Sequence, residues 1–507
     1  MNAFLLRHFF REACVWEPRE RLLQWGHGSS WTIGRSYEGS LHLGASGSGK
    51  TSGGIRAQGL AVMRAGYGVL GLTVKGTSPS DSELLLDMAR QAGRENSVVL
   101  VGPSHGLGFN LLRHEMIASR RKHFTGDLAS NVAALFSAAA ELALPRRDGK
   151  HGEQIWRQAV ESLVRHSVTI VFGATGDLRL DDIVSVVRSA PQNAAQLKDP
   201  SWRRESLCID LLERATQRNP LDRNLGLARD YFLTEFVNYP PDTKNSVLFT
   251  FGAGCADLFL RDPLHSMFFG ATDYTPDILL EGAILVVDCP VLEYREVGQV
   301  ANGLLRICTQ RVLERRAGHP SLRPVSILWD EAQKTLLPSD VAFQDTARSA
   351  LCATVAAAQH IPAIREAVGR ELAATFLGNL RSKVFFQSNE PETGDYMRSL
   401  CGLKEVKRPT ENYGSDGRKG SSETPVPEDA LPAHATHNLK TGGKENGHKV
   451  TGLLIVGSKR MRHGEPYQKI AINQKHLGAS CWPFTKQAQV LARVRPAPDF
   501  RYLRAKG

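Results

Sequence analysis

Residues 44–51, Gly44-Ala45-Ser46-Gly47-Ser48-Gly49-Lys50-Thr51, give the strongest indication of the fold. This stretch matches the pattern G-x-x-x-x-G-K-[ST] at every required position, follows the strand-like stretch 40–43 and leads into a segment that can be helical. Glycines let the backbone curl so that successive N–H groups face one anion, and the start of a helix favours negative charge there. The pattern therefore predicts a strand, a phosphate-binding loop and a helix.

Two side chains of this loop have predicted roles of their own. Lys50 is expected to reach the β- and γ-phosphates of a nucleotide, and the Thr51 hydroxyl to bind Mg²⁺. The other nucleotide-binding residues of the loop are Gly44, Ala45, Ser46, Gly47, Ser48 and Gly49. ATP and Mg²⁺ are thus the expected ligands. The alternative, a flexible turn of glycine and serine, does not explain the strand and helix on its two sides.

A carboxylate at the end of a neighbouring strand must hold the Mg²⁺, and a second one must activate water. Two apolar runs end in an acid: 283–287 is followed by Asp288, and 325–329 by Asp330 and Glu331. We favour the second run because it offers Asp330 for the metal and Glu331 as general base. Asp288 is then a strand-end residue that enters a turn. An acid pair favours ATP hydrolysis over small-molecule phosphotransfer, because a kinase excludes water.

Further apolar runs predict the rest of a sheet. Those bounded by turn residues are 69–74, 97–101, 246–251, 283–287, 325–329, 353–357 and 384–386. Runs that are apolar throughout indicate strands buried on both faces, and hence a mainly parallel sheet covered by helices. Between about His114 and Tyr239 the pattern changes to helical spacing, for example at Leu128, Val132, Leu135 and Phe136. An α/β core with an all-helical insertion is therefore expected.

The chain of 507 residues is long for one domain, since about 150 residues per domain gives roughly three units. We divide it into 1–113, the first part of a nucleotide-binding domain; 114–239, the helical insertion; 240–407, the second part with the second ATP motif; and 408–507, a linker, a hairpin and a basic C-terminal region. Gly, Pro, Ser, Asn and charged residues crowd 408–449, which is typical of a mobile loop or linker. Segments 451–457 and 467–473 are the predicted hairpin.

Composition excludes several classes of protein. Hydrophobic residues make up 42% and charged residues 23% of the chain, which argues against a disordered, fibrous or membrane-embedded protein. The apolar runs are far shorter than the roughly 20 residues of a membrane span, and we expect no secretory signal at the start. The eight cysteines are scattered without a Cys-x-x-Cys pair, which suits a reducing cytosol and argues against a zinc module or a disulfide scaffold.

The positive charge is concentrated near the C-terminus. The net charge is +11, and residues 404–507 hold 19 Lys and Arg against 9 Asp and Glu. The basic clusters there are Arg418-Lys419, Lys459-Arg460-x-Arg462 and the stretch from Arg493 to Lys506. They suit contacts to nucleic-acid phosphates and, equally, a solvated polar tail. Charge alone does not choose between the two.

The order of the motifs resembles that of the conjugative coupling proteins of type IV secretion systems, the TraG/TraD family of RecA-like DNA-translocating ATPases. The resemblance covers roughly residues 40–405. Besides the phosphate loop, it rests on Thr73-Val-Lys-Gly76 (usually Asp-Pro-Lys-Gly in the family), Phe109-Asn-Leu-Leu112 (similar to its Asn-Pro-Leu turn), Trp329-Asp-Glu-Ala-Gln333 (its second ATP motif) and the segment from Ser388 to Gly402. It implies a RecA-like P-loop NTPase core with a mainly parallel sheet and an inserted helical domain.

The resemblance also implies roles for two further residues. Gln359, at the end of the run 353–357, matches the glutamine that senses the γ-phosphate, and Arg348 matches an arginine that reaches into the neighbouring subunit's ATP site. A glutamine at a strand end beside the loop is able to donate to a phosphate oxygen or to the attacking water. A guanidinium supplied in trans stabilises transition-state charge and makes hydrolysis depend on ring assembly. Without the resemblance, both residues would be taken as structural or surface groups.

The activity that the resemblance implies is ATP-driven translocation of DNA, or of a relaxase–DNA complex, in conjugative transfer. A homo-hexamer is expected, with DNA and relaxase or relaxosome proteins as partners. Basic residues of the insertion are candidate phosphate contacts, although exposed helix charges are more often merely solvated: Arg146, Arg147, Lys150, Arg203 and Arg204. The alternatives are a DNA-processing or defence motor of the FtsK or HerA type, and a nucleotide-gated adaptor that recruits cargo. Intact Lys50, Asp330 and Glu331 favour turnover.

Two departures from the family stand out. Family members usually have two membrane spans before the loop, whereas 43 residues precede Gly44 here. We therefore expect a cytoplasmic protein, either peripheral on the cytoplasmic face of the inner membrane through an anchored partner or working outside a secretion channel. The second departure is Thr73 in place of the family's aspartate, which removes a charge and leaves the role of Lys75 open.

Overall fold

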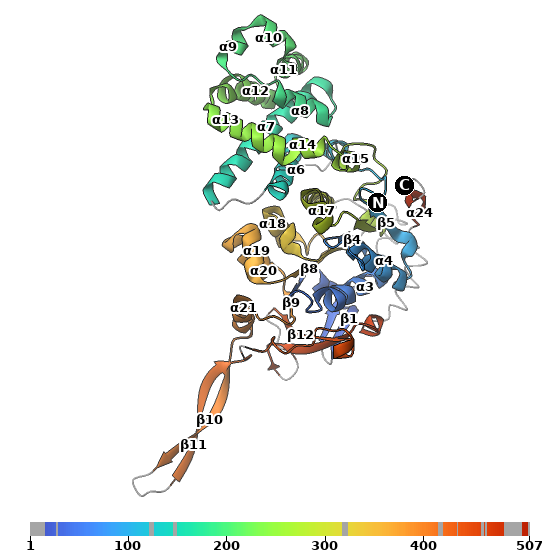
Figure 1. The fold of residues 1–507 in the computed structure, drawn as a ribbon, viewed down its shortest axis with the longest axis vertical. Coiled ribbons are helices and arrows are strands. Elements are labelled where there is room, and N and C mark those ends of the chain that lie inside the picture. Colours follow the sequence, from blue (N-terminus) through green and yellow to red (C-terminus); the bar gives the residue numbers. More distant parts are fainter. Residues whose placement is uncertain are drawn as a thin grey trace, which may run out of the picture. The chain divides into compact units, whose positions relative to one another are not determined.

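The computed structural model describes residues 16–26, 29–120, 126–144, 150–316, 323–413, 419–432, 434–457, 461, 464–480 and 499–504. The chain divides into two compact units. The first comprises Met1–Val69, Asp87–Arg94 and Leu322–Pro496, and the second comprises Leu70–Leu86, Glu95–Ser321 and Ala497–Gly507. Figure 1 labels their helices and strands.

A sheet of nine strands has the order β13-β12-β9-β3-β8-β7-β4-β6-β5. In chain order the strands are β3 (Ser40–Leu43), β4 (Gly68–Leu72), β5 (Val98–Val101), β6 (Ile284–Val287), β7 (Val325–Trp329), β8 (Cys352–Ala358), β9 (Ser382–Phe385), β12 (Lys449–Val456) and β13 (Gln468–Asn473). The pairs β3–β8, β3–β9, β7–β8 and β5–β6 are parallel, whereas β12 is antiparallel to both β9 and β13. The predicted α/β fold with a mainly parallel sheet is confirmed.

In the first unit, β3, β7 and β8 are buried along their whole length, as expected of strands covered on both faces. The unit's helices are α2 (Ile33–Ser36), the π-helical η1 (Lys50–Ile55), α3 (Arg56–Arg64), the short η6 (Ala332–Lys334), α18 (Pro338–Thr346), α19 (Ile361–Val368), α20 (Arg370–Asn379), α21 (Pro391–Cys401), η7 (Lys444–Asn446) and α22 (Leu477–Ser480). Strands β1 (Arg21–Gly26) and β2 (Ser29–Thr32) form a separate antiparallel pair. Helix α4 (Asp81–Gln91) has residues in both units.

The second unit holds β5, β6 and most of the helices. They are η2 (Glu95–Ser97), α5 (Leu111–Ser119), α6 (Leu128–Ala143), α7 (Lys150–Thr175), α8 (Leu180–Arg188), α9 (Ala194–Lys198), α10 (Pro200–Glu205), α11 (Leu207–Arg218), α12 (Arg223–Asp230), η3 (Tyr231–Glu235), η4 (Phe236–Asn238), α13 (Pro241–Phe251), η5 (Gly252–Ala256), α14 (Asp257–Phe259), α15 (Leu264–Phe268), α16 (Ile278–Glu281), α17 (Val291–Glu314) and α24 (Arg501–Arg504). Helix α7 packs against α6, α8, α11, α12 and α13, as Figure 1 shows. The helical spacing predicted for this region is present, and the helices continue to Glu281.

One predicted strand is wrong. Residues 246–251 belong to α13, which begins at Pro241. Val247 and Phe251 are buried, whereas Phe249 between them is 67% exposed, so the burial follows the helical repeat. A six-residue apolar run does not distinguish a strand from one turn and a half of helix by itself. The proline at the first helical position, which favours a helix start, was the overlooked signal.

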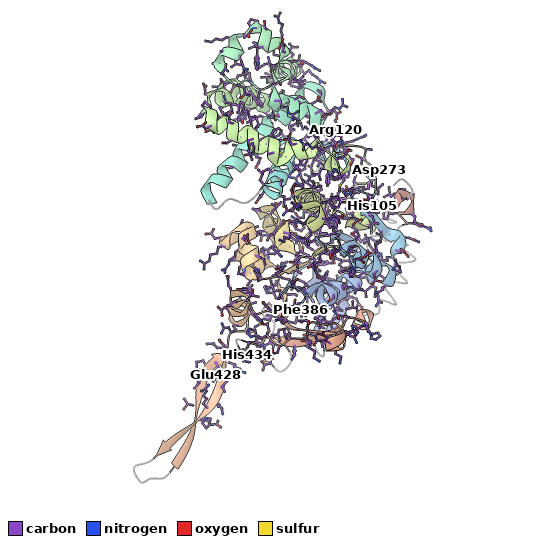
Figure 2. All side chains as sticks on the ribbon, in the orientation of Figure 1. His105, Arg120, Asp273, Phe386, Glu428 and His434 are labelled. Carbon is purple, nitrogen blue, oxygen red and sulfur yellow. The ribbon has the colours of Figure 1, made fainter. Side chains whose placement is uncertain are left out.

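The loop predicted over 408–449 is wrong for its first half, 408–429, whereas the described residues from 430 to 448 are mostly turns. Strands β10 (Leu403–Tyr413) and β11 (Lys419–Asp429) form an antiparallel hairpin that shares no strand with the nine-stranded sheet (Figure 1; Glu428 is labelled in Figure 2). Its prolines fall at alternate positions: Pro409 opposes Glu423, Pro425 opposes Lys407 and Pro427 opposes Glu405. Alternate residues of a strand turn their N–H away from the partner, so these prolines remove no ladder hydrogen bond. The composition that suggested a linker is therefore compatible with pairing.

Other expectations have mixed outcomes. The hairpin predicted at 451–457 and 467–473 is β12–β13 and is confirmed. Arg146, Arg147, Arg418, Lys459, Arg460, Arg462, Arg493 and Lys506 lie outside the described residues. No helix in the described part of the chain is long and apolar enough to cross a membrane. The six cysteines that the structure describes are free and buried, as expected of small apolar side chains.

Candidate nucleotide site

The phosphate loop connects β3 to η1 in the first unit. Two of its glycines, Gly47 with φ +75° and Gly49 with φ +94°, adopt the left-handed backbone conformation that other residues rarely take. A Cβ on Gly44 would lie 2.8 Å from the Cβ of Phe386 (labelled in Figure 2), so this position also requires a glycine. The N–H of Ala45 donates to the Gln387 carbonyl at 2.8 Å and ties the loop to the segment after β9. The loop is thus curled as its sequence predicts.

Lys50 is buried at the centre of the loop. Its side chain is 4% exposed, and its Nζ donates to the carbonyls of Gly44 at 2.8 Å and Ala45 at 3.1 Å. The same Nζ lies 4.0 Å from Glu331 Oε1. Ser48 Oγ is also buried, and it has no hydrogen-bond partner within the described part of the chain. An ammonium folded back on its own loop beside an unpartnered hydroxyl is an arrangement that fits a phosphate ligand.

Asp330 and Glu331 follow β7 and are both 5% exposed. Thr51 Oγ1 donates to Asp330 Oδ2 at 2.5 Å, although the two residues are far apart in sequence. Asp330 Oδ1 accepts from the N–H of Glu331 at 2.9 Å. Glu331 has φ +46°, which is uncommon for a residue with a side chain and marks a constrained position. The hydroxyl and carboxylate predicted to share a metal are therefore in direct contact.

Gln333 is a residue of this site that sequence reasoning left without a role. Its Nε2 donates to Glu331 Oε2 at 2.6 Å, so it fixes the orientation of that carboxylate. Its Oε1 is buried and, in the chain as described, has no hydrogen-bond partner. The position was visible in the Asp-Glu-Ala-Gln stretch, where an amide two residues after the predicted base is within reach of it.

Gln359 directly follows β8, the strand that lies between β3 and β7. In the parallel register Leu43 pairs with Ala358, and Trp329 pairs with Ala356. Gly44 follows Leu43 and Gln359 follows Ala358, so the two residues leave their paired strands at the same level. The strand end at Gln359 lies between those of the phosphate loop and the acidic pair, as a phosphate-sensing role requires.

Arg348 is not brought to the site of its own chain by any described contact. It lies in the turn between α18 and β8, where its side chain is exposed. Its backbone carbonyl accepts from the N–H of Leu351 at 3.2 Å, so the turn itself is ordered. This placement leaves the guanidinium available to a neighbouring subunit, and the role in trans remains a proposal.

Asp288, the rejected alternative to Asp330, lies after β6 in the second unit. Its Oδ1 accepts from Ser82 Oγ at 2.5 Å, and its Oδ2 bonds to Nε2 of His105 at 2.7 Å (Figure 2 labels His105). The hydrogen bond from His105 lowers the pKa of the Asp288 carboxyl, and that from Ser82 adds to the effect. These contacts join the ends of β5 and β6 to α4 and give Asp288 a structural function.

The second departure from the family pattern also has a local explanation. Thr73, after β4, is buried, and its Oγ1 donates to the Val287 carbonyl at 2.5 Å. The carboxylate near this loop is supplied by Asp81, whose Oδ2 accepts from the N–H groups of Val74 at 2.7 Å and Lys75 at 2.8 Å. Asp81 thus stabilises the turn from α4, while the function of the Lys75 side chain stays open.

His42 lies beneath the loop on β3. Its Nε2 bonds to Gln58 Oε1 at 2.6 Å, and Gln58 Nε2 donates to Ser40 Oγ at 2.9 Å. A Cβ on Gly54 would lie 2.5 Å from His42 Nδ1, so η1 approaches the imidazole closely only because that residue is glycine. Burial lowers the pKa of His42 to about 4, and the charge of Lys50 contributes in the same direction. The imidazole is therefore neutral and leaves Lys50 as the local cation.

Comparisons with known proteins identify this fold. Residues 324–440 match the family model described as the TraM recognition site of TraD and TraG. The chain is similar to the unbound bacterial conjugative coupling protein TrwBdeltaN70, with a TM-score of 0.59, 15% identity and 92% of each chain covered. The chain shares the fold of the conjugative coupling proteins. The resemblance predicted from the motifs is confirmed.

Two further coupling-protein structures contain nucleotides. The plasmid coupling protein TrwB in complex with the non-hydrolysable ATP analogue ADPNP matches with a TM-score of 0.53 and 15% identity, over 92% of each chain. TrwB with ADP and Mg²⁺ matches with a TM-score of 0.52 and 16% identity, over 90% of this chain and 89% of that one. A search among curated protein sequences gave no match. At these identities the coupling-protein likeness establishes the fold.

Proposed function

We propose that this chain is an ATP-hydrolysing DNA translocase that works as a coupling protein in conjugative transfer. The observation that carries the proposal is the contact of Thr51 with Asp330, beside Lys50 and Glu331, at the ends of β3 and β7, the strands on the two sides of β8. A pure binding module has no need of a buried second carboxylate held by Gln333. The similar coupling-protein structures with an ATP analogue and with ADP and Mg²⁺ support nucleotide binding in this fold.

The residues of the site have separate tasks in this proposal. Lys50 exchanges its two loop carbonyls for phosphate oxygens, and the loop N–H groups hold the same anion. Thr51 and Asp330 would hold Mg²⁺, which when bound neutralises phosphate charge. Glu331 accepts a proton from the attacking water, while Gln333 keeps its carboxylate oriented. Gln359 donates to the γ-phosphate or the water, so that loss of phosphate shifts the end of β8.

Assembly is the second part of the proposal. Arg348 is exposed in its own chain, and we assign it to the ATP site of a neighbouring subunit in a homo-hexamer. A guanidinium that arrives only on assembly restricts hydrolysis to the ring. The partners are DNA and relaxase or relaxosome proteins, with residues 324–440 as the segment that recognises a component of the TraM type. We place the protein at the cytoplasmic face of the inner membrane through a membrane-anchored partner.

The test is ATP hydrolysis by the full chain with and without DNA, measured together with the molar mass in ATP. We expect single- or double-stranded DNA to raise the rate several-fold, and Lys50→Ala to abolish it in both conditions. A rate that no DNA of any length changes would favour a nucleotide-gated adaptor. Absence of hydrolysis and of nucleotide binding would contradict the proposal altogether.

A further inference from the structure

Gln474, the residue after β13, connects the phosphate-binding helix to the C-terminal part of the chain. Its Nε2 donates to Ser52 Oγ at 2.7 Å, and its Oε1 accepts from the N–H of Gly443 at 2.9 Å. Its own N–H donates to the His448 carbonyl at 2.9 Å. Ser52 lies in η1 immediately after Thr51. One side chain therefore spans from the helix that begins at Lys50 to the loop 441–448, which precedes β12.

The same loop and strand pack on the glycines of the phosphate site. A Cβ on Gly49 would lie 2.5 Å from Val450 Cγ1 and 3.2 Å from the Thr441 carbonyl, and a Cβ on Gly53 would lie 3.3 Å from Val450 Cβ. On the other side of the contact, a Cβ on Gly442 would lie 2.5 Å from the Gln474 amide. The Val450 side chain and the Thr441 carbonyl thus pack directly on the phosphate-loop backbone at Gly49, which leaves little room for an independent movement of either segment.

The strand register places this contact at the ligand-binding edge of the sheet. Leu453 of β12 pairs with Phe385, the last residue of β9, so residues 449–452 extend past the end of that parallel strand. The phosphate loop leaves β3 at the same edge, because His42 and Leu43 pair with Val384 and Phe385. Strands β8 and β7, with Gln359 and Asp330, lie on the opposite side of β3. Segment 441–452 thus packs against the phosphate loop on the side opposite the acidic pair.

Helix η1 is weak by itself and needs packing contacts of this kind. It is π-helical over Lys50–Ile55, a form that is rare and usually limited to single turns, and its N-cap Gly49 supplies no side-chain hydrogen bond. Gly53 and Gly54 within it weaken it further, since glycine is an unfavourable helix residue. The C-terminal part also holds the far end of the continuing helix α3, where Arg64 Nη1 donates to the Gly478 carbonyl at 3.0 Å. Contacts from Val450 and Gln474 therefore compensate for a weak helix start, and Gly478 adds one at the end of α3.

We propose that Gln474 is a positioning residue for the phosphate-binding helix and that segment 441–452, together with Gln474, is a structural part of the nucleotide site. The inference rests on the proposed function, because it assigns the role through nucleotide binding at Lys50 and Thr51. Gln474 touches neither the acidic pair nor Lys50. Its loss acts through the position of Ser52 and the adjoining Thr51, so it weakens nucleotide binding and leaves the chemical step largely intact.

The experiment compares the full-length chain with Gln474→Ala, using MgATP as the probe. We expect KM and the dissociation constant for MgATP to rise by about threefold to tenfold, as the loss of the partly buried hydrogen bond to Ser52 allows, with kcat changed less than twofold. Ser52→Ala removes the same bond from the other side, and the double variant should bind no worse than the weaker single one. Lys475→Ala, an exposed neighbour of Gln474, is the matched control.

A second readout does not depend on activity. In the protein without nucleotide, Gln474→Ala and Ser52→Ala should both accelerate amide hydrogen exchange over residues 49–55, whereas Lys475→Ala should not. Unchanged exchange together with an unchanged KM in both variants would overturn the proposal. So would effects of the two variants that simply add. If the unmodified chain fails to bind MgATP, the proposed function fails, whereas the exchange experiment still decides whether Gln474 holds the helix.

Discussion

The loop at residues 44–51 forms the start of helix η1, and segment 441–452 packs against it together with Gln474, yet only the loop has a recognisable sequence pattern. The loop's chemistry depends on residues that are adjacent in the chain, so a short pattern contains it. The C-terminal segment meets the helix through Val450 and Gln474, about 400 residues away in sequence. Its composition resembled that of a linker and a basic tail. A site can therefore have one part that local sequence specifies and another that only the fold assembles.

The strongest test of this comparison is to remove the second region. Deleting residues 404–507 eliminates β12, the antiparallel neighbour of β9, together with Val450 and Gln474. The charge of this region suits contacts to nucleic-acid phosphates and, equally, a solvated polar tail. The structure instead predicts loss of MgATP binding and of cooperative unfolding, measured by calorimetry and by thermal denaturation.

A matched deletion separates the two parts of that region. Replacing residues 404–428 with a short Gly/Ser linker removes the β10–β11 hairpin, whose ends Leu403 and Asp429 are paired and easily reconnected. That hairpin shares no strand with the nine-stranded sheet, so MgATP binding should stay within about twofold of the original. Full nucleotide binding by the larger deletion would show that segment 441–452 and Gln474 are dispensable to the site.

The next largest effect concerns Arg348, which we propose acts in the ATP site of a neighbouring subunit. We expect Arg348→Ala to assemble normally and to hydrolyse ATP about a thousandfold more slowly, in line with other arginines supplied in trans. Mixing it with Glu331→Gln should restore part of the activity, since some interfaces then pair an intact Glu331 with an intact Arg348. If mixed rings stay inactive, Arg348 acts within its own chain.

A pair of glycine variants measures how tightly the two regions meet. Gly47→Ala and Gly49→Ala both place a side chain at a positive φ, which costs roughly 1–2 kcal/mol. A Cβ on Gly47 meets nothing within 4 Å, whereas one on Gly49 would collide with Val450. Gly49→Ala should therefore destabilise the nucleotide-free protein by about 1–3 kcal/mol more, as measured by denaturant unfolding. Equal losses would mean that the contact with Val450 is loose.

The last prediction concerns a pH dependence beneath the loop, which is seen only under acidic conditions. The pKa of His42 is lowered from 6.5 to about 4 in the folded protein, so the unfolded chain binds more protons between these values. Its contribution to stability is complete above about pH 6.5 and is lost as the pH falls toward 4, by roughly 3 kcal/mol in total. His42→Gln should flatten the pH dependence of the unfolding free energy, with His434→Gln as an exposed control. An unchanged slope would contradict the buried, neutral imidazole.

Much of the fold was predictable because fully buried parallel strands leave continuous apolar runs. The runs at β4 to β9 were found in this way, and helical spacing indicated the helices that follow His114. Residues 246–251 were misassigned because a short apolar run fits both kinds of element, and β10–β11 was missed because its prolines, glycines and charged residues are typical of a linker. Burial inside a sheet thus leaves a clear sequence signal, whereas an exposed hairpin leaves little.

The candidate site shows the same limits. The phosphate loop and the pair Asp330–Glu331 were identified from the chemistry they must perform, and the structure brings Thr51 and Asp330 into contact. Gln474 had no local signal, because its role depends on a strand from another part of the chain. Gly53 and Gly54 were the available hint: two glycines in a helix are unfavourable, so they indicate that something packs closely against it.

If the loop at Lys50 and the acidic pair at Asp330–Glu331 act on the same magnesium nucleotide, both sets of residues must affect ATP turnover, but in different ways. Binding and hydrolysis of MgATP, measured in the unmodified chain, Lys50→Ala and Glu331→Gln, distinguish the two. We expect Lys50→Ala to lose binding, whereas Glu331→Gln should still bind but hydrolyse about 10²–10⁴-fold more slowly. Hydrolysis by Glu331→Gln at the original rate, or binding unaffected by Lys50→Ala, would contradict a shared nucleotide site.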